Sequence, residues 1–304
     1  MISVIVPVFN EAECIQTFIN STEPVLNDIG QVYEIIFVND GSSDETELRI
    51  QEVSKNNTNI RTINFSRNFG KDAAMSAGLR ECLGDYAVLI DVDLEHPPEV
   101  IKEFFNILKD PTIYQVTGVR HGTKQTFLKG IMRKVFHTFL NKYSSIYFPE
   151  NATDFCMIKK EVINAINSMN EKERFIRGLL SWHGFKTEYL KFKVGKRSAG
   201  VTSFSPAQIS SYARKGFISF SSAPLKIWIM VGSFFASLSF LYILYVILKK
   251  VIYGNAVPGF VTLVCMVGFF GGLNLVVLGV IGEYIAELFD EVKNRPLYIK
   301  KDSK

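Results

Sequence analysis

The chain has 304 residues, with 34 Lys and Arg against 30 Asp and Glu and a net charge of +4. That balance is too slight to indicate nucleic acid as the main partner, and a hydrophobic content of 47% excludes a disordered or low-complexity chain. The four cysteines stand far apart, without the spacing of a zinc site or a disulfide framework, which favours a reducing, cytosol-facing location.

Short β-branched apolar runs alternate with amphipathic helical patterns through the first 120 residues. We predict strands at residues 2–8, 33–39, 60–65, 86–91 and 113–119, and helices at 11–26, 45–53, 72–82 and 98–108. This alternation predicts an α/β fold with a mostly parallel sheet covered on both faces. In such sheets the ligand crevice lies beyond the carboxyl ends of the strands.

Polar clusters follow three of these strands, at residues 10–11, 39–42 and 91–93, and we expect them to meet at that crevice. The first strand leads into VPVFNE rather than a glycine-rich turn, and no loop ends in Gly-Lys-Ser/Thr, which excludes the common nucleotide-binding motifs. A metal is the remaining means of holding a phosphate. Asp91, Asp93 and Glu95 supply oxygen ligands suited to Mg²⁺ or Mn²⁺. An isolated Asp-x-Asp is more often a solvated acidic loop than a metal site, so the metal prediction depends on the motifs that accompany it.

Basic and apolar residues interleave between residues 124 and 147, which predicts an amphipathic helix lying at a membrane interface. Arg133 in this segment is a candidate contact for a lipid phosphate. A second interfacial helix is expected at 205–225, with its amphipathic pattern at 206–220. Ordinary helices packed on the sheet are the alternative.

Two uncharged stretches, 227–248 and 251–282, each exceed the roughly 20 residues that span a bilayer. We predict a transmembrane hairpin with spans at about 227–248 and 258–282; two buried helices of a soluble core are the alternative. Basic residues flank the hairpin at both ends, so both termini are expected in the cytoplasm, and no signal peptide precedes the first strand. The expected domains are 1–204, the helix at 205–225, and the hairpin with its basic tail at 226–304.

Four ordered motifs together resemble glycosyltransferase family 2, in particular its polyprenyl-phosphate branch of dolichyl-phosphate mannose synthases and bactoprenol glucosyltransferases. The resemblance covers nearly the whole chain, including the membrane hairpin that marks the bacterial members. The motifs are 6–11 (VPVFNE), 38–44 (VNDGSSD), 65–71 (FSRNFGK) and 91–99 (DVDLEHPPE).

The resemblance implies a glycosyltransferase-A fold that binds a nucleotide-sugar and a divalent metal, Mg²⁺ or Mn²⁺. The metal would be held by Asp91, Asp93 and Glu95, with Asp93 as the main ligand. The family usually has glutamine at the position of Glu95 and aspartate at that of His96, so a more anionic site with a different metal preference is expected; His96 itself is expected to be a loop residue. The implied nucleotide-sugar contacts are Pro7, Phe9, Glu11, Val38, Asp40, Asp91, Val92 and Asp93, with Asp40 accepting a base N–H.

On the acceptor side the resemblance places Arg120 and Arg197 against phosphate, for which the planar guanidinium is suited. Ser203 stands where the family usually has a lysine, so it is open whether this chain makes the phosphate contact that the lysine would supply. The family segment that reads Asp-Phe-Arg is here Asp154-Phe155-Cys156. Whether Asp154 orients substrate or caps structure stays open, and Cys156 is expected to be a buried thiol.

The implied reaction is a single inverting displacement, with Asp91, Asp93, Arg120 and Arg197 as catalytic residues. We expect transfer of glucose from UDP-glucose to undecaprenyl phosphate at the cytoplasmic face of a bacterial inner membrane, by a multi-pass protein. The product would serve modification of surface polysaccharide such as O-antigen. A flippase, a downstream membrane glycosyltransferase and a second copy of the chain are possible partners.

Alternative interpretations remain. The same reaction could use GDP-mannose, UDP-N-acetylglucosamine, UDP-galactose or an aminoarabinose donor. A processive polysaccharide synthase is disfavoured because the Gln-x-x-Arg-Trp signature and a channel's helices are missing. A non-enzymatic scaffold or flippase partner is disfavoured by the retained aspartates and arginines. A transporter is disfavoured because neither span carries a charge pair.

Overall fold

The computed structural model describes residues 1–121, 151–169, 171, 174–195, 223–253 and 259–301. The interfacial segments predicted at 124–147 and 206–220 lie outside these ranges, as do Arg133, Arg197 and Ser203. The roles expected of these residues therefore stay predictions.

Within the described residues the N-terminal domain is built on one sheet of seven strands, in the order β3-β2-β1-β4-β6-β5-β7. The strands are β1 (Ile2–Val8), β2 (Tyr33–Asn39), β3 (Ile60–Asn64), β4 (Tyr86–Leu89), β5 (Gln115–His121), β6 (Ala152–Lys159) and β7 (Thr187–Lys193). The first four strands pair in parallel, as predicted. β6 runs antiparallel between β4 and β5, and β7 is parallel to β5. The sheet is therefore parallel in its first half and mixed in its second.

The bounds of the first two strands match the prediction, whereas later strands differ at their ends. β4 stops at Leu89, where its pairing with β1 and β6 ends, so the loop that carries Asp91 begins earlier than predicted. β5 continues to His121 because β7, which we did not predict, pairs with it that far. Arg120 therefore lies within β5 and not after it. β6 escaped prediction because it is buried on both faces and shows no alternation.

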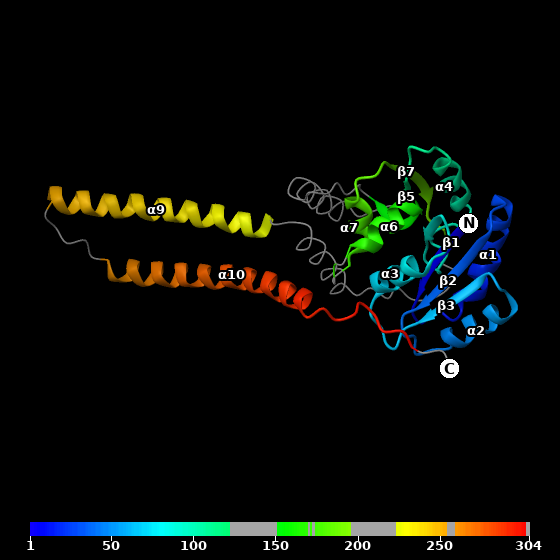
Figure 1. Cartoon of the computed structure of the whole chain (residues 1–304). Helices are drawn as coiled ribbons and strands as arrows, with labels where there is room; N and C mark the ends of the chain where they lie inside the picture. Colours follow the sequence, from blue (N-terminus) through cyan, green and yellow to red (C-terminus); the bar gives the residue numbers. More distant parts are fainter. Residues whose placement is uncertain (122–150, 170, 172–173, 196–222, 254–258, 302–304) are drawn as a thin grey trace.

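Helices cover both faces of the sheet (Figure 1). On one face α1, α2 and α4 enclose a core that includes Phe18, Phe37 and Phe104. On the other face α3, α6 and α7 enclose a second core that includes Met75 and Ile163. The helices are α1 (Cys14–Ile29), α2 (Thr46–Asn56), α3 (Lys71–Glu81), α4 (Val100–Leu108), α6 (Lys160–Ser168) and α7 (Ile176–Trp182).

Two long helices, α9 (Ala223–Tyr253) and α10 (Phe260–Val292), extend side by side away from the sheet (Figure 1). α9 contains the span predicted at 227–248, and α10 covers the span predicted at 258–282 from residue 260 onward. The two helices are in contact where the ring of Phe235 packs edge-on to that of Phe269, with centroids 5.3 Å apart. Among the described residues, one window, Phe269–Ala286 in α10, is long and apolar enough to cross a membrane, and none of it is buried within the molecule.

The chain beyond α10 returns to the sheet domain and lies against the edge formed by β3 (Figure 1). Lys300 forms an isolated antiparallel bridge with Phe65, and Leu297 and Tyr298 pack against the core under α3. The segment that the sequence indicated only as a basic tail is therefore part of the folded domain.

Candidate active site

The loop after β4 gathers three acidic side chains at the carboxyl end of the parallel strands. Asp91 and Asp93 lie in this loop, and the backbone N–H of Glu95 donates to Asp93 Oδ1 at 3.0 Å. Burial raises the pKa of Asp93, and the negative charges of Asp91 and Glu95 raise it further against the effect of that hydrogen bond. A cation bound at this loop would relieve the repulsion, which is the electrostatic property required of a metal site.

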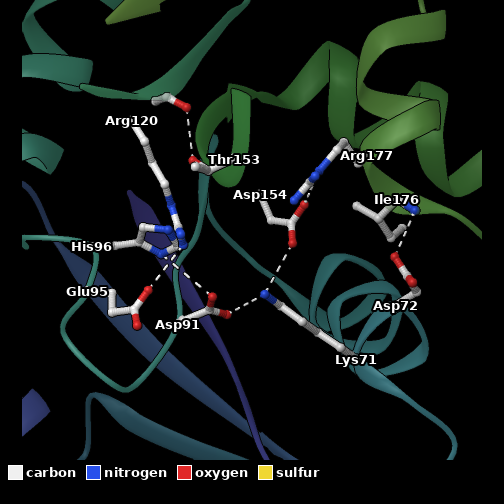
Figure 2. Close-up of polar contacts among 11 residues, drawn as sticks. Lys71, Asp72, Asp91, Glu95, His96, Arg120, Thr153, Asp154, Ile176 and Arg177 are labelled. Atoms are coloured by element: carbon white, nitrogen blue, oxygen red, sulfur yellow. Dashed lines mark hydrogen bonds and ion pairs between the residues drawn. The ribbon is translucent and has the colours of Figure 1, made fainter. Parts of the chain in front are cut away.

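Asp91 is held by Lys71, the first residue of α3 (Figure 2). The Lys71 ammonium Nζ lies 2.6 Å from Asp91 Oδ1 and 3.1 Å from Asp154 Oδ2. Burial alone would raise the pKa of Asp91, but the positive charge of Lys71 outweighs it and the pKa is lowered. Burial likewise opposes the charge of Lys71, but the two carboxylates outweigh it and raise the pKa of Lys71. Asp91 is thus a fixed, ionised carboxylate.

Asp154 joins this network to the second half of the domain. It lies near the start of β6, and Arg177 of α7 donates from Nε to its Oδ1 at 2.8 Å (Figure 2). Burial opposes ionisation of Asp154, but Arg177 and Lys71 outweigh it and keep its pKa well below the usual range. Within the described residues, Asp154 holds Lys71 in place. Lys71 stood in one of the family-like motifs, but no sequence signal paired it with a residue 83 positions away.

Arg120 and Glu95, expected to contact phosphate and metal respectively, form an ion pair, with Nη2 and Oε2 3.2 Å apart (Figure 2). The loop residue His96 is only 2% exposed and stacks on Phe155, with ring centroids 5.1 Å apart. Burial lowers the pKa of His96, whose Nδ1 lies 3.7 Å from Asp91 Oδ2. His96 therefore lies in the loop, as expected, but its side chain is buried beneath the acidic residues.

The residues expected to contact the nucleoside lie at or just after the carboxyl ends of β1 and β2. Phe9 is 40% exposed, whereas Asp40 is buried and accepts the backbone N–H groups of Phe69 and Gly70 at 2.6 and 2.9 Å. Burial raises the pKa of Asp40, and the two N–H donors act against that shift. The Asp40 carboxylate thus links the turn at the end of β2 to the loop before α3 by two hydrogen bonds.

The remaining expected nucleotide contacts differ in what they can offer a ligand. Val38 and Val92 are buried in the two cores, so neither side chain is accessible to a ligand. Pro7 and Glu11, by contrast, are partly exposed at the end of β1. The structure therefore brings these residues to one edge of the sheet but gives side-chain access to only some of them.

Among the described residues, no three His, Cys, Asp or Glu side chains are arranged to enclose a metal ion by themselves. Mg²⁺ and Mn²⁺ are commonly held by one or two carboxylates together with substrate phosphates. Asp93 with Asp91 fits that type of donor set, because both carboxylates lie in the same loop and the charges of Asp91 and Glu95 raise the pKa of Asp93.

Residues 3–166, more than half of the chain, match the model of glycosyl transferase family 2. The chain belongs to this family. Residues 223–288 match the model named GtrB C-terminal hairpin, which covers α9 and most of α10. The family membership and the hairpin expected from the sequence are therefore confirmed.

Relatives with known names share the full length of this glycosyltransferase. The bactoprenol glucosyl transferase of Shigella phage SfII is 36% identical over 302 residues, which are 99% of this chain and 98% of the relative. The prophage bactoprenol glucosyl transferase homolog of Escherichia coli K12 is 36% identical over 300 residues, covering 99% and 98%. An uncharacterized glycosyltransferase of Synechocystis, sll0501, is 36% identical over 303 residues, covering 99% and 95%.

Among solved structures, glucosyl-3-phosphoglycerate synthase from Mycobacterium tuberculosis, in complex with Mn²⁺, UDP and phosphoglyceric acid, superposes with a TM-score of 0.50. It is 20% identical in sequence, and the match covers 72% of this chain and 76% of that chain. The likeness concerns the fold, and the predicted glycosyltransferase-A fold is confirmed.

Proposed function

We propose that this glycosyltransferase transfers glucose from UDP-glucose to undecaprenyl phosphate, with a divalent cation, Mg²⁺ or Mn²⁺. The observation that carries the proposal is the identity of 36% along almost the whole chain, hairpin included, with proteins named bactoprenol glucosyl transferase. The acidic loop at the carboxyl end of β4 supports it, because carboxylates there can hold a divalent cation. A nucleoside diphosphate needs such positive charge around its leaving oxygens.

In this mechanism a phosphate oxygen of the lipid attacks the anomeric carbon while the bond from that carbon to the diphosphate breaks, and the nucleoside diphosphate leaves. The attacking phosphate is already anionic near neutral pH, so the protein supplies position rather than a strong base. Lys71 keeps Asp91 ionised and oriented. A cation bound by Asp93 and Asp91 would neutralise charge on the departing diphosphate.

Arg120 is proposed to meet the lipid phosphate, with Arg197 and Arg133 as further contacts from segments outside the described residues. The ion pair of Arg120 with Glu95 keeps this guanidinium beside the acidic loop, at the boundary between the proposed donor and acceptor sites. Pro7, Phe9, Glu11 and Asp40 line the proposed nucleoside side.

We place the hairpin in a bacterial inner membrane as a multi-pass anchor, with the sheet domain in the cytoplasm. The exposed apolar surface of α10 supports this placement. The product would be a polyprenyl-phosphate sugar for modification of surface polysaccharide such as O-antigen, used together with a flippase and a downstream membrane glycosyltransferase.

The test is an assay of full-length protein with undecaprenyl phosphate, Mg²⁺ or Mn²⁺ and a panel of radiolabelled nucleotide-sugars, in which label is followed into organic solvent. We expect metal-dependent transfer from UDP-glucose and a loss of about 1,000-fold or more in Asp93→Ala. Asp28→Asn, an exposed aspartate paired with Lys102, is the matched control and should keep full activity. Transfer from another donor would correct the sugar, and full activity of Asp93→Ala would overturn the site assignment.

A further inference from the structure

The loop at residues 65–70, between β3 and α3, connects the two sides of the proposed donor site. At the end of this loop, the backbone N–H groups of Phe69 and Gly70 donate hydrogen bonds to the Asp40 carboxylate. Its backbone also touches the turn after β2, since a Cβ on Gly41 would lie 2.3 Å from the carbonyl carbon of Arg67. Lys71 follows directly and reaches Asp91. The position of this loop therefore sets the position of both Asp40 and Lys71.

Residues 297–301, which follow α10, are bound at the start of this loop; we call this segment the C-terminal strap. The N–H of Ser66 donates to the carbonyl of Ile299 at 2.9 Å, and the N–H of Lys301 donates to the carbonyl of Asn64 at 2.8 Å. These bonds satisfy the carbonyl of Asn64, the last residue of the edge strand β3, and the N–H of Ser66 just beyond it.

An aromatic stack adds side-chain packing to the backbone pairing. The ring of Tyr298 lies flat on Phe65, with centroids 4.7 Å apart and an angle of 12°. Phe65 in turn meets Phe69 edge-on, with centroids 5.7 Å apart. Tyr298 is thus one ring removed from the residue whose N–H binds Asp40. The strap also forms ion pairs, such as that of Lys301 with Glu47 at 2.9 Å. Because the lysine is exposed, this pair stabilises the docked strap less than the aromatic stack does.

Only residues 293–296 separate the strap from the last residue of α10, Val292. The loop that sets Asp40 and Lys71 is therefore tied to the end of the proposed membrane hairpin. We propose that the C-terminal strap is a positioning element for the donor site, which holds residues 65–70 against Asp40 so that nucleotide-sugar binds well only when the strap is docked. This inference rests on the proposed glycosyl transfer for its kinetic consequence but not for its structural one.

The structural test is hydrogen–deuterium exchange on the full-length protein. Tyr298→Ala should raise the exchange rates of the Ser66, Phe69 and Gly70 amides by about 10-fold, since local opening becomes easier. Tyr298→Phe keeps the stacked ring and should retain the original rates. If Tyr298→Ala does not fold, Tyr298→Leu, which keeps apolar volume without the aromatic stack, carries the same expectation. Unchanged exchange in the folded variant would overturn the proposal.

The kinetic test separates positioning from general destabilisation. With UDP-glucose as the donor probe, or whichever donor of the panel is active, Tyr298→Ala should raise the donor KM by about 10-fold and leave the KM for undecaprenyl phosphate unchanged. Lys102→Ala, remote on α4, is the surface control. A lower kcat with both KM values unchanged would indicate a smaller folded fraction and would overturn the positioning role. The exchange result does not use activity, so its outcome is independent of the proposed reaction.

Discussion

The two halves of the sheet contribute to the site in different ways. In the first half, β1, β2 and β4 run in parallel, and each is followed by polar residues at the same edge. In the second half, the antiparallel β6 and the helix α7 bring Asp154 and Arg177 to residues of the first half. The first half thus places the groups proposed to meet the donor, and the second half contributes Asp154, which holds Lys71 against Asp91.

Asp91 and Asp93 show how immediate neighbours determine the charge of single residues in the acidic loop. They stand two positions apart in one loop, yet the pKa of Asp91 is lowered and that of Asp93 is raised. Both shifts begin from burial, which raises each pKa; the difference arises because Lys71 lies against Asp91, while Asp93 has other carboxylates nearby. Neighbouring acidic residues in a sequence therefore need not share an electrostatic role.

Among variants that keep Asp93, the largest expected effect comes from removing the link between the halves. Lys71→Met leaves Asp91 and Asp154 without the cation between them, so we expect transfer activity to fall by about 100-fold. Lys71→Arg keeps the charge and should recover part of the activity. Lys102→Met, which breaks an exposed pair, is the control. Near-normal transfer by Lys71→Met, measured with the glycolipid assay, would show that the two halves act independently.

A second prediction concerns packing within the first half. Gly41 has φ +66°, and a Cβ there would strike the backbone of Arg67, whereas Gly30 has φ +72° with nothing within 4 Å. Gly41→Ala should therefore cost about 3 kcal/mol of unfolding free energy, and Gly30→Ala about 1 kcal/mol from the left-handed conformation alone. Chemical denaturation of both variants measures the difference. Equal losses would mean that the 65–70 loop moves away at little cost.

Glu95→Gln tests the pair that spans the proposed donor and acceptor sides. Loss of the carboxylate releases Arg120, so we expect the KM for undecaprenyl phosphate to fall by about 3-fold. The glutamine also restores the residue that the family usually has. An unchanged or higher acceptor KM would show that Glu95 positions Arg120 productively instead of restraining it.

The smallest expected effect is a pH dependence confined to the second half. Burial lowers the pKa of His183 to about 4, and its Nδ1 accepts the Phe185 N–H at 3.0 Å. The neutral ring is therefore favoured in the folded state, and its stabilisation is complete above about pH 6.5 and is lost as pH falls towards 4. The full shift corresponds to about 2 kcal/mol less unfolding free energy at pH 5 than at pH 7, and solvent screening of the partly exposed ring reduces this to about 1 kcal/mol. Thermal unfolding of His183→Asn should show a weaker pH dependence than the unmodified protein, and an identical dependence would contradict the assignment.

The sequence by itself determined the parallel half of the sheet, the two long apolar helices and the acidic residues after β4. These features follow from local periodicity and from polar residues at strand ends, which act over a few neighbouring positions. Arg120 and Glu95 were also identified from the sequence, although their mutual ion pair was not.

Only the tertiary structure decided which of these groups are held, and by what. The pairing of Leu89 with Cys156 between β4 and β6 brings Asp91 and Asp154 to opposite sides of Lys71. The stack of Tyr298 on Phe65 likewise joins the end of the chain to its first third. Such contacts depend on which strands become neighbours and in what register, and no short-range pattern in the sequence contains that information.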